Sequence, residues 1–170
     1  MKRMSWKYIA GFVDGEGCLD MQLVHNDRAP QKMACGAAYL RPRLRIAQAA
    51  PGKFVLDQLK ANFGGSISVR NKDRVLNAAW SESYSWEFVG RRIRGLLQDI
   101  VNHMYIKREQ ARFTIWVIDN IMDKNVGPDT RQVIRDEMSA MKSDPQRLSE
   151  RAIAAVQQSM RQSTQTEAVA

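Results

Sequence analysis

The sequence predicts an α+β fold in which helices cover one face of a four-stranded antiparallel sheet. Three observations lead to this prediction. Four segments alternate apolar and polar residues with the period of a β-strand: "CLDMQLVHND", "YLRPRLRIAQ", "SISVRNK" and "AAWSESYSWEFV". Apolar residues recur at helical spacing before, between and after these segments. The resulting order is αββαββα, followed by further C-terminal helices, and two strand pairs in this order favour a single antiparallel sheet.

The first helix is predicted over residues 4–14, where apolar residues recur at three- and four-residue steps: Trp6, Ile9, Ala10 and Val13. Gly11 lies in the middle of this helix, where glycine costs about 1 kcal/mol relative to alanine. We therefore expect another backbone to approach closely at Gly11. Gly15 and Gly17 are expected to end the helix.

The second strand carries the clearest pattern, with apolar residues on one face and three arginines, Arg41, Arg43 and Arg45, on the other. Pro42 within it favours an edge position, because proline cannot donate a ladder hydrogen bond. A polar sheet face rich in arginine can enter a major groove, where arginine binds guanine; the alternative is a solvated basic face. The residues expected to contact DNA are Gln22, Asn26, Arg28, Lys32, Arg41, Arg43, Arg45, Ser66, Ser68, Arg70, Lys72, Ser81, Ser83 and Ser85.

The remaining helices are predicted over residues 52–62, 91–103, 107–122, 129–142 and 145–161. Gly127 and Pro128 separate the last two of these helices from the rest. We therefore expect a core over residues 1–125, a C-terminal helical extension over 126–162 and a flexible tail over 163–170.

The charge balance favours a nucleic-acid partner. Lys and Arg number 26 against 18 Asp and Glu, which gives a net charge of +8 and an isoelectric point near 9.8. Such a surplus attracts polyanions. An anionic membrane surface is the second possibility, but no segment has the pattern of a basic amphipathic anchor or a transmembrane span. A basic protein without a nucleic-acid role is a third.

The two cysteines, Cys18 and Cys35, form no CxxC pair and favour a reducing compartment. The N-terminal apolar run is too short for a signal peptide. We expect an intracellular protein without a targeting signal; an organelle, a phage or a bacterial intron would each suit it as host.

"IAGFVDGEG", residues 9–17, resembles the LAGLIDADG signature of homing endonucleases. The order of elements after it also resembles the core of that family, over roughly residues 5–122, and one copy of the motif is seen. The resemblance implies a homodimer of the single-motif type, in which the motif helices of two subunits pack together. The interface residues it implies are Ile9, Ala10, Gly11 and Val13.

The resemblance also implies a site at the end of this helix. Glu16 aligns with the metal-binding carboxylate of the family, usually Asp, and Gly15 would add its backbone carbonyl. These oxygen ligands suit Mg²⁺ or another divalent cation such as Mn²⁺, which would also explain acids at the negative end of a helix dipole. Asp14 aligns with a mostly structural acid.

Gln48 and Lys107 resemble residues that order water and stabilise phosphate charge in the family. Lys53 and Arg108 are further candidates for the same basic pocket. The resemblance, carried by Glu16 and these residues, implies Mg²⁺-dependent hydrolysis of both strands of a long, pseudo-palindromic double-stranded DNA target, leaving 3′ overhangs. The alternatives are an RNA splicing maturase or a DNA-binding protein of the same fold without cleavage, and a small dimerising interaction module.

Overall fold

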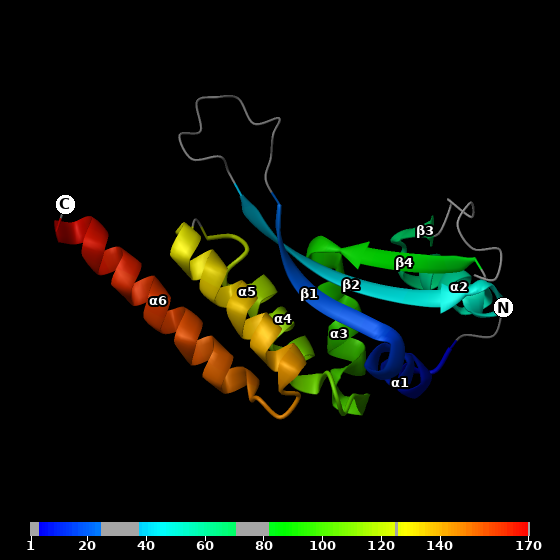
Figure 1. Cartoon of the computed structure of the whole chain (residues 1–170). Coiled ribbons are helices and arrows are strands. Elements are labelled where there is room, and N and C mark those ends of the chain that lie inside the picture. The colour runs from blue at the N-terminus through cyan, green and yellow to red at the C-terminus, as the bar shows by residue number, and fades with distance from the viewer. Residues whose placement is uncertain (1–3, 25–37, 71–81, 125, 170) are drawn as a thin grey trace, which may run out of the picture.

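The computed structural model describes residues 4–24, 38–70, 82–124 and 126–169, with the side chains of Arg70 and of 163–169 excepted. These residues form a four-stranded antiparallel sheet with helices, as the sequence predicts (Figure 1). The elements are α1 (Trp6–Glu16), β1 (Gly17–Val24), β2 (Tyr39–Ala49), α2 (Lys53–Phe63), β3 (Ser66–Arg70), β4 (Ser83–Val89), α3 (Ile93–Ile100), α4 (Arg108–Asn120), α5 (Pro128–Ser143) and α6 (Ser149–Val169).

The strand order in the sheet is β1-β2-β4-β3. Strand β2 is therefore an inner strand, and the edge position predicted from Pro42 is wrong. The register explains how the proline is tolerated. Pairing between β2 and β4 begins at Arg43 opposite Val89, so Pro42 lies one residue beyond it and pairs only with Met21 of β1. Its missing N–H costs no ladder bond to β4.

The hydrophobic core lies between the sheet and the helices on one of its faces. Leu44, Ile46 and Trp86 point into it and are fully buried. The indole nitrogen of Trp86 donates a hydrogen bond of 2.8 Å to the Gly64 carbonyl at the end of α2, which satisfies its polar atom. A second cluster packs α4, α5 and α6 together, and these helices lie at the end of the molecule opposite α2 (Figure 1).

Helix α1 begins after Ser5, whose hydroxyl accepts a hydrogen bond of 3.2 Å from the Tyr8 N–H. It continues through Gly15 to Glu16, two residues beyond the predicted end, and β1 starts at once with Gly17. A Cβ at residue 17 would lie 2.5 Å from the Val13 carbonyl oxygen. This abrupt change from helix to strand therefore requires glycine, and it fixes the position of Glu16 beside the sheet.

The C-terminal segment folds as two long helices that lie side by side. The backbone of α6 extends to Val169, so residues 163–169 continue the helix where the sequence predicted a flexible tail. The division into a core and a C-terminal extension stays a prediction. None of the helices in the described ranges is long and apolar enough to cross a membrane.

Candidate active site and nucleic-acid interface

The end of α1 is tied to the turn before α4 by Asp14. This side chain is only 8% exposed. Its two carboxylate oxygens accept hydrogen bonds from the backbone N–H groups of Tyr105 (2.6 Å) and Lys107 (2.9 Å). Hydrogen bonds from backbone donors to an ionised carboxylate are among the stronger ones in proteins. Asp14 is therefore a structural acid, as the sequence predicts, and it positions the residue that follows the turn.

That residue is Lys107, whose ammonium group returns to donate a hydrogen bond to the Asp14 backbone carbonyl. The side chain is half-buried. Burial lowers the pKa of Lys107 from its ordinary value, and the nearby charges of Asp14, Cys18 and Glu16 oppose the shift. The charge of Glu16 is thus close enough to Lys107 to act on its pKa. The shared catalytic role of the two residues stays a prediction.

Glu16 is the last residue of α1 and is exposed. Within the described part of the chain it makes no hydrogen bond or ion pair, and the last turn of α1 holds no basic residue. A carboxylate here faces the negative end of the helix dipole, where a cation is favoured, and the charge of Lys107 lies close enough to interact with it. Together with the carbonyl of the exposed Gly15, it offers the hard oxygen ligands that Mg²⁺ binds.

Glu16 and the Gly15 carbonyl supply two oxygen ligands, a donor set that fits a divalent cation such as Mg²⁺. Among the described residues, no three His, Cys, Asp or Glu side chains gather closely enough to hold a metal ion.

Gln48 lies at the same end of the sheet as Glu16. Strand β2 runs two residues past Ile46, which is opposite Gly17, before it reaches Gln48. The Gln48 side chain is half-buried on the helix-facing side of the strand. It packs against Gly52: a Cβ added at Gly52 would lie 2.7 Å from the Gln48 Oε1. This placement is compatible with the predicted role in ordering water, which stays a prediction.

The two further basic candidates have partners of their own. Lys53 bonds Asp57 one turn later in α2, with an Nζ–Oδ2 distance of 2.7 Å. The Nε of Arg108 donates to the Met104 carbonyl at 2.7 Å. Neither Lys53 nor Arg108 forms a hydrogen bond or ion pair with Glu16 in the structure.

The polar face of the sheet holds the predicted arginines, but two of them bind within the protein. Arg41 donates to the Gln22 amide oxygen at 2.8 and 3.1 Å. Arg43 forms a two-pronged ion pair with Asp20 and reaches Glu87 on the other side. Arg45 makes no hydrogen bond or ion pair with the described residues. Sequence reasoning placed all three on one face correctly and missed the cross-strand pairing.

Ser85 differs from the exposed DNA contact that the sequence predicts, because it is 1% exposed and its Oγ has no partner in the structure. It lies in β4 between β2 and β3, where neighbouring side chains cover so short a residue. Ser66 and Ser68 are exposed and Ser83 is half-buried. The side chain of Arg70 and all of Asn26, Arg28, Lys32, Lys72 and Ser81 lie outside the described residues.

Three of the four residues predicted for a dimer interface lie in the chain's own core. Ile9, Ala10 and Val13 are buried in the core of the chain itself, at 2% exposure or less. They face the sheet because this side of the helix supplies its apolar stripe. Of the four predicted residues, only Gly11 is exposed.

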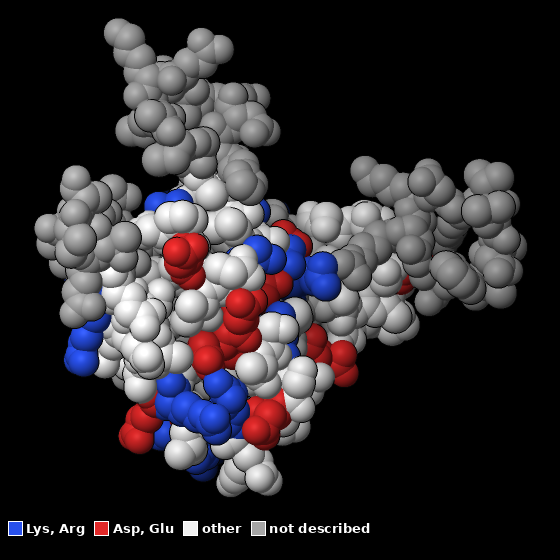
Figure 2. All heavy atoms as spheres, turned by 60° about the vertical axis from the view of Figure 1, so that its left-hand side comes forward, with Lys and Arg blue, Asp and Glu red and all other residues white. Residues whose placement is uncertain are grey.

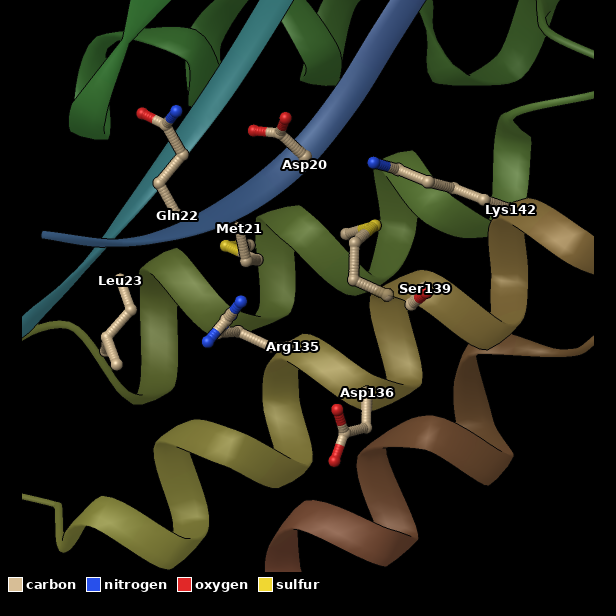
Figure 3. A pocket seen from close by; sticks show the side chains of 9 residues that line it. Asp20, Met21, Gln22, Leu23, Arg135, Asp136, Ser139 and Lys142 are labelled. Atoms are coloured by element: carbon tan, nitrogen blue, oxygen red, sulfur yellow. The ribbon is translucent and has the colours of Figure 1, made fainter.

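A cavity of about 480 Å³ lies between β1 and α5 (Figure 3). Asp20 and Gln22 line it from the strand, and Arg135 and Lys142 from the helix. On the side of the molecule where α5 and α6 lie, acidic and basic side chains are interspersed (Figure 2). This side is therefore not a uniformly basic surface.

Comparison with known proteins agrees with this geometry. The model of the LAGLIDADG endonuclease family matches residues 9–94, half of the chain. The homing endonuclease I-CvuI in complex with its target is 20% identical, with 91% of this chain and 93% of that chain covered and a TM-score of 0.63. The homing endonuclease I-TnaI is also 20% identical, over 93% and 99% of the two chains, with a TM-score of 0.55.

I-SmaMI bound to its uncleaved DNA target is 19% identical, with 91% of this chain but 49% of that chain covered and a TM-score of 0.57. At these identities the likeness to the solved structures shows the fold. No curated protein matches the chain. From the family match, the motif at the end of α1 and the shared fold, the chain belongs to the LAGLIDADG family of homing endonucleases.

Proposed function

We propose that this chain is a site-specific homing endonuclease that acts as a homodimer. It hydrolyses both strands of a long, pseudo-palindromic DNA duplex, with Mg²⁺ as cofactor, and leaves 3′ overhangs. The observation that carries the proposal is the exposed Glu16 at the negative end of α1, near the anchored Lys107. Glu16 has no hydrogen-bond or ion-pair partner among the described residues. Asp14, by contrast, accepts two backbone hydrogen bonds within the chain.

The residues of the site have different roles in the proposed reaction. Glu16 and the Gly15 carbonyl would hold the cation, which when bound polarises the scissile phosphate and lowers the pKa of attacking water. Lys107 uses one of its three N–H donors on the Asp14 carbonyl. The other two remain for a phosphate oxygen, where they stabilise negative charge that develops in the transition state. Gln48 orders water through its amide group.

The homodimer part of the proposal is supported by an exposed face of α1. Tyr8, Gly11, Phe12 and Gly15 recur at positions i, i+3, i+4 and i+7, so they line one side of the helix. The rings of Tyr8 and Phe12 stack on each other at 6.0 Å, and Tyr8 is 48% exposed. A Cβ at Gly11 or Gly15 would meet nothing within 4 Å in its own chain. Packing within the chain therefore does not explain either glycine.

A second copy seated on this face would explain both glycines, because small residues let two helix backbones approach closely. The face leads directly to Glu16, so such packing would place two Glu16 side chains near one another. The proposed interface is thus the exposed side of α1, opposite the buried Ile9, Ala10 and Val13.

The catalytic proposal is tested on a plasmid in which the two DNA segments that flank the gene are joined directly to each other. The cleavage reaction contains Mg²⁺. We expect the wild-type chain to cut both strands at one position and the Glu16→Gln variant to bind without cutting. Asp99→Asn, which removes an exposed acid on α3, is the matched control and should cut normally. Binding without cutting by the wild type, in Mg²⁺ and in Mn²⁺, would favour the maturase or non-cleaving alternative.

The dimer is tested by the mass of the protein–DNA complex in solution. Gly11→Leu should abolish a complex with two chains. Gly95→Leu is the matched control, because Gly95 is also an exposed glycine inside a helix with nothing within 4 Å of a Cβ. A single wild-type chain on the duplex, or two chains with Gly11→Leu, would contradict the proposed interface.

A further inference from the structure

The three arginines of β2 occupy equivalent positions but differ in what holds them. Arg41, Arg43 and Arg45 alternate along one strand, share one sheet face and are all half-buried. Arg41 is occupied by the Gln22 amide oxygen, which accepts from both its Nε and its Nη2. The differences between Arg43 and Arg45 are larger and have consequences for DNA recognition.

Arg43 is fixed from both sides. Its Nε and Nη2 donate to the two carboxylate oxygens of Asp20 at 3.1 and 2.6 Å, and its Nη1 lies 3.5 Å from Glu87. The network spans β1, β2 and β4, and the side chains of Arg43 and Asp20 are 18% and 17% exposed. Binding DNA through this guanidinium would break the pair and leave two carboxylates facing phosphates, which is unfavourable.

Arg45 has no such restraint. Its register neighbours are Cys18 in β1 and Glu87 in β4, yet Glu87 turns towards Arg43. All five N–H donors of Arg45 are left without a partner among the described residues. The side chain two register steps along β4, Ser85, also keeps an unpartnered hydroxyl. The centre of the polar face therefore holds unsatisfied hydrogen-bonding groups between the occupied pairs.

We infer that Arg45 reads a guanine in each half of the DNA target, whereas Arg43 is a scaffold residue that reads no base. The inference rests on the proposed DNA-cleaving function. A sheet that enters a major groove presents its central residues to base edges, and its rim to phosphates. Arg45 is central, with a strand paired on each side. Its free planar fork matches the O6 and N7 acceptors of guanine.

The experiment is a binding selection from a pool of random-sequence duplexes at fixed salt, followed by sequencing of the retained DNA. It compares the wild-type chain with Arg45→Ala, Arg45→Lys and the double variant Asp20→Asn/Arg43→Gln. The double variant removes both charges of the pair, so the net charge of the chain is unchanged. Thermal unfolding of each variant shows that the compared proteins are folded.

We expect the wild type to select a motif with a guanine at one position of each half-site. Arg45→Ala should lose that preference, with a roughly 5- to 150-fold weaker binding to the wild-type motif, and keep the rest of the motif. Arg45→Lys should restore overall binding more than the preference, because lysine cannot form the two-pronged contact. The double variant should keep the guanine preference and unfold at a lower temperature.

Three results would overturn the inference. The first is an unchanged motif with Arg45→Ala. The second is a uniform loss of binding to all sequences with Arg45→Ala that Arg45→Lys restores, which would make Arg45 a phosphate contact. The third is loss of the guanine preference in the double variant alone. If the wild type retains no duplex at all, the proposed function fails as well; if it selects a motif and only the Arg45 result fails, the proposed function stands.

Discussion

Two polar regions of this molecule are organised in different ways: the corner at the end of α1 and the outer face of the sheet. At the corner, one buried carboxylate, Asp14, accepts two backbone hydrogen bonds and fixes a turn that carries Lys107. On the sheet face, half-buried side chains such as Arg43 and Asp20 pair with one another across strands. The corner is thus held through main-chain atoms, and the face through side chains alone.

This difference indicates where the chain tolerates amino-acid substitution. Replacing Asp14 leaves buried backbone donors without partners, so the cost falls on the fold and on the position of Lys107 together. Replacing a pair on the sheet face alters a surface and leaves the backbone ladder intact. We expect the corner to be intolerant of substitution and the face to accept exchanges that alter which DNA is bound.

The largest expected effect comes from Asp14→Asn. An amide in place of the carboxylate turns an N–H donor towards a backbone donor, and the free energy of unfolding should fall by about 2–3 kcal/mol. Urea unfolding measures this. Glu16→Gln, at an exposed position two residues away, should change the free energy of unfolding by no more than about 0.5 kcal/mol. Equal stabilities of the two variants would show that the backbone hydrogen bonds to Asp14 do not hold the corner.

The second prediction concerns the ion pair of the sheet face. Arg43→Ala should lower the free energy of unfolding by about 1–2 kcal/mol, because it leaves the mostly buried Asp20 carboxylate uncompensated. A double-mutant cycle with Asp20→Ala should give a coupling of about 1 kcal/mol. Arg45→Ala is the reference and should be nearly neutral for stability. A coupling near zero would mean that the pair contributes nothing to the sheet.

The third prediction concerns Glu109 in α4, two residues after Lys107, and the pH dependence of its contribution to stability. Burial alone would raise the pKa of Glu109, but hydrogen bonds from the N–H and hydroxyl of Ser149, and from Arg112, outweigh it and lower the pKa below its ordinary 4.5. The Glu109 carboxylate therefore binds a proton more readily in the unfolded chain than in the folded one. The free energy of unfolding then rises with pH between the lower folded pKa and the unfolded pKa of Glu109.

Glu109→Gln should therefore lower the free energy of unfolding by about 1 kcal/mol at neutral pH. The stabilisation by Glu109 is complete above its unfolded pKa and is lost as the pH falls through the lower folded pKa. Urea unfolding at several pH values measures it, with the exposed Glu150→Gln as control. A constant difference between wild type and Glu109→Gln at all pH values would show that ionisation of Glu109 is not the cause.

The smallest effect, on the salt dependence of DNA binding, is expected at the cavity between β1 and α5. There Lys142 places an exposed positive charge beside the sheet face. Lys142→Gln should leave stability unchanged and reduce the salt dependence of duplex binding by at most about one unit of slope. Lys60→Gln, on α2, provides the comparison for loss of one charge. The same slope for both variants would exclude the cavity from the DNA-binding surface.

Periodicity and the motif predicted much of this arrangement. The alternation in β2 placed three arginines on one face, and the acids at the end of α1 marked the corner. The edge position predicted from Pro42 was wrong, and Ile9, Ala10 and Val13, which the resemblance assigned to a partner chain, lie in the chain's own core. Local pattern does not reveal which neighbour covers a residue. The spacing of Tyr8, Gly11, Phe12 and Gly15 was the signal that could have identified the exposed side of α1.

The sequence by itself determined the elements, the polar face of the sheet and the position of the acidic motif, because these follow from periods of two and 3.6 residues and from local glycine chemistry. Tertiary structure alone decided which acid is buried and which is free, and which arginine has a partner. Asp14 and Tyr105 are far apart in the chain, as are Arg43 and Glu87. Contacts over such separations depend on how the elements pack, and packing sums many weak interactions that no local pattern records.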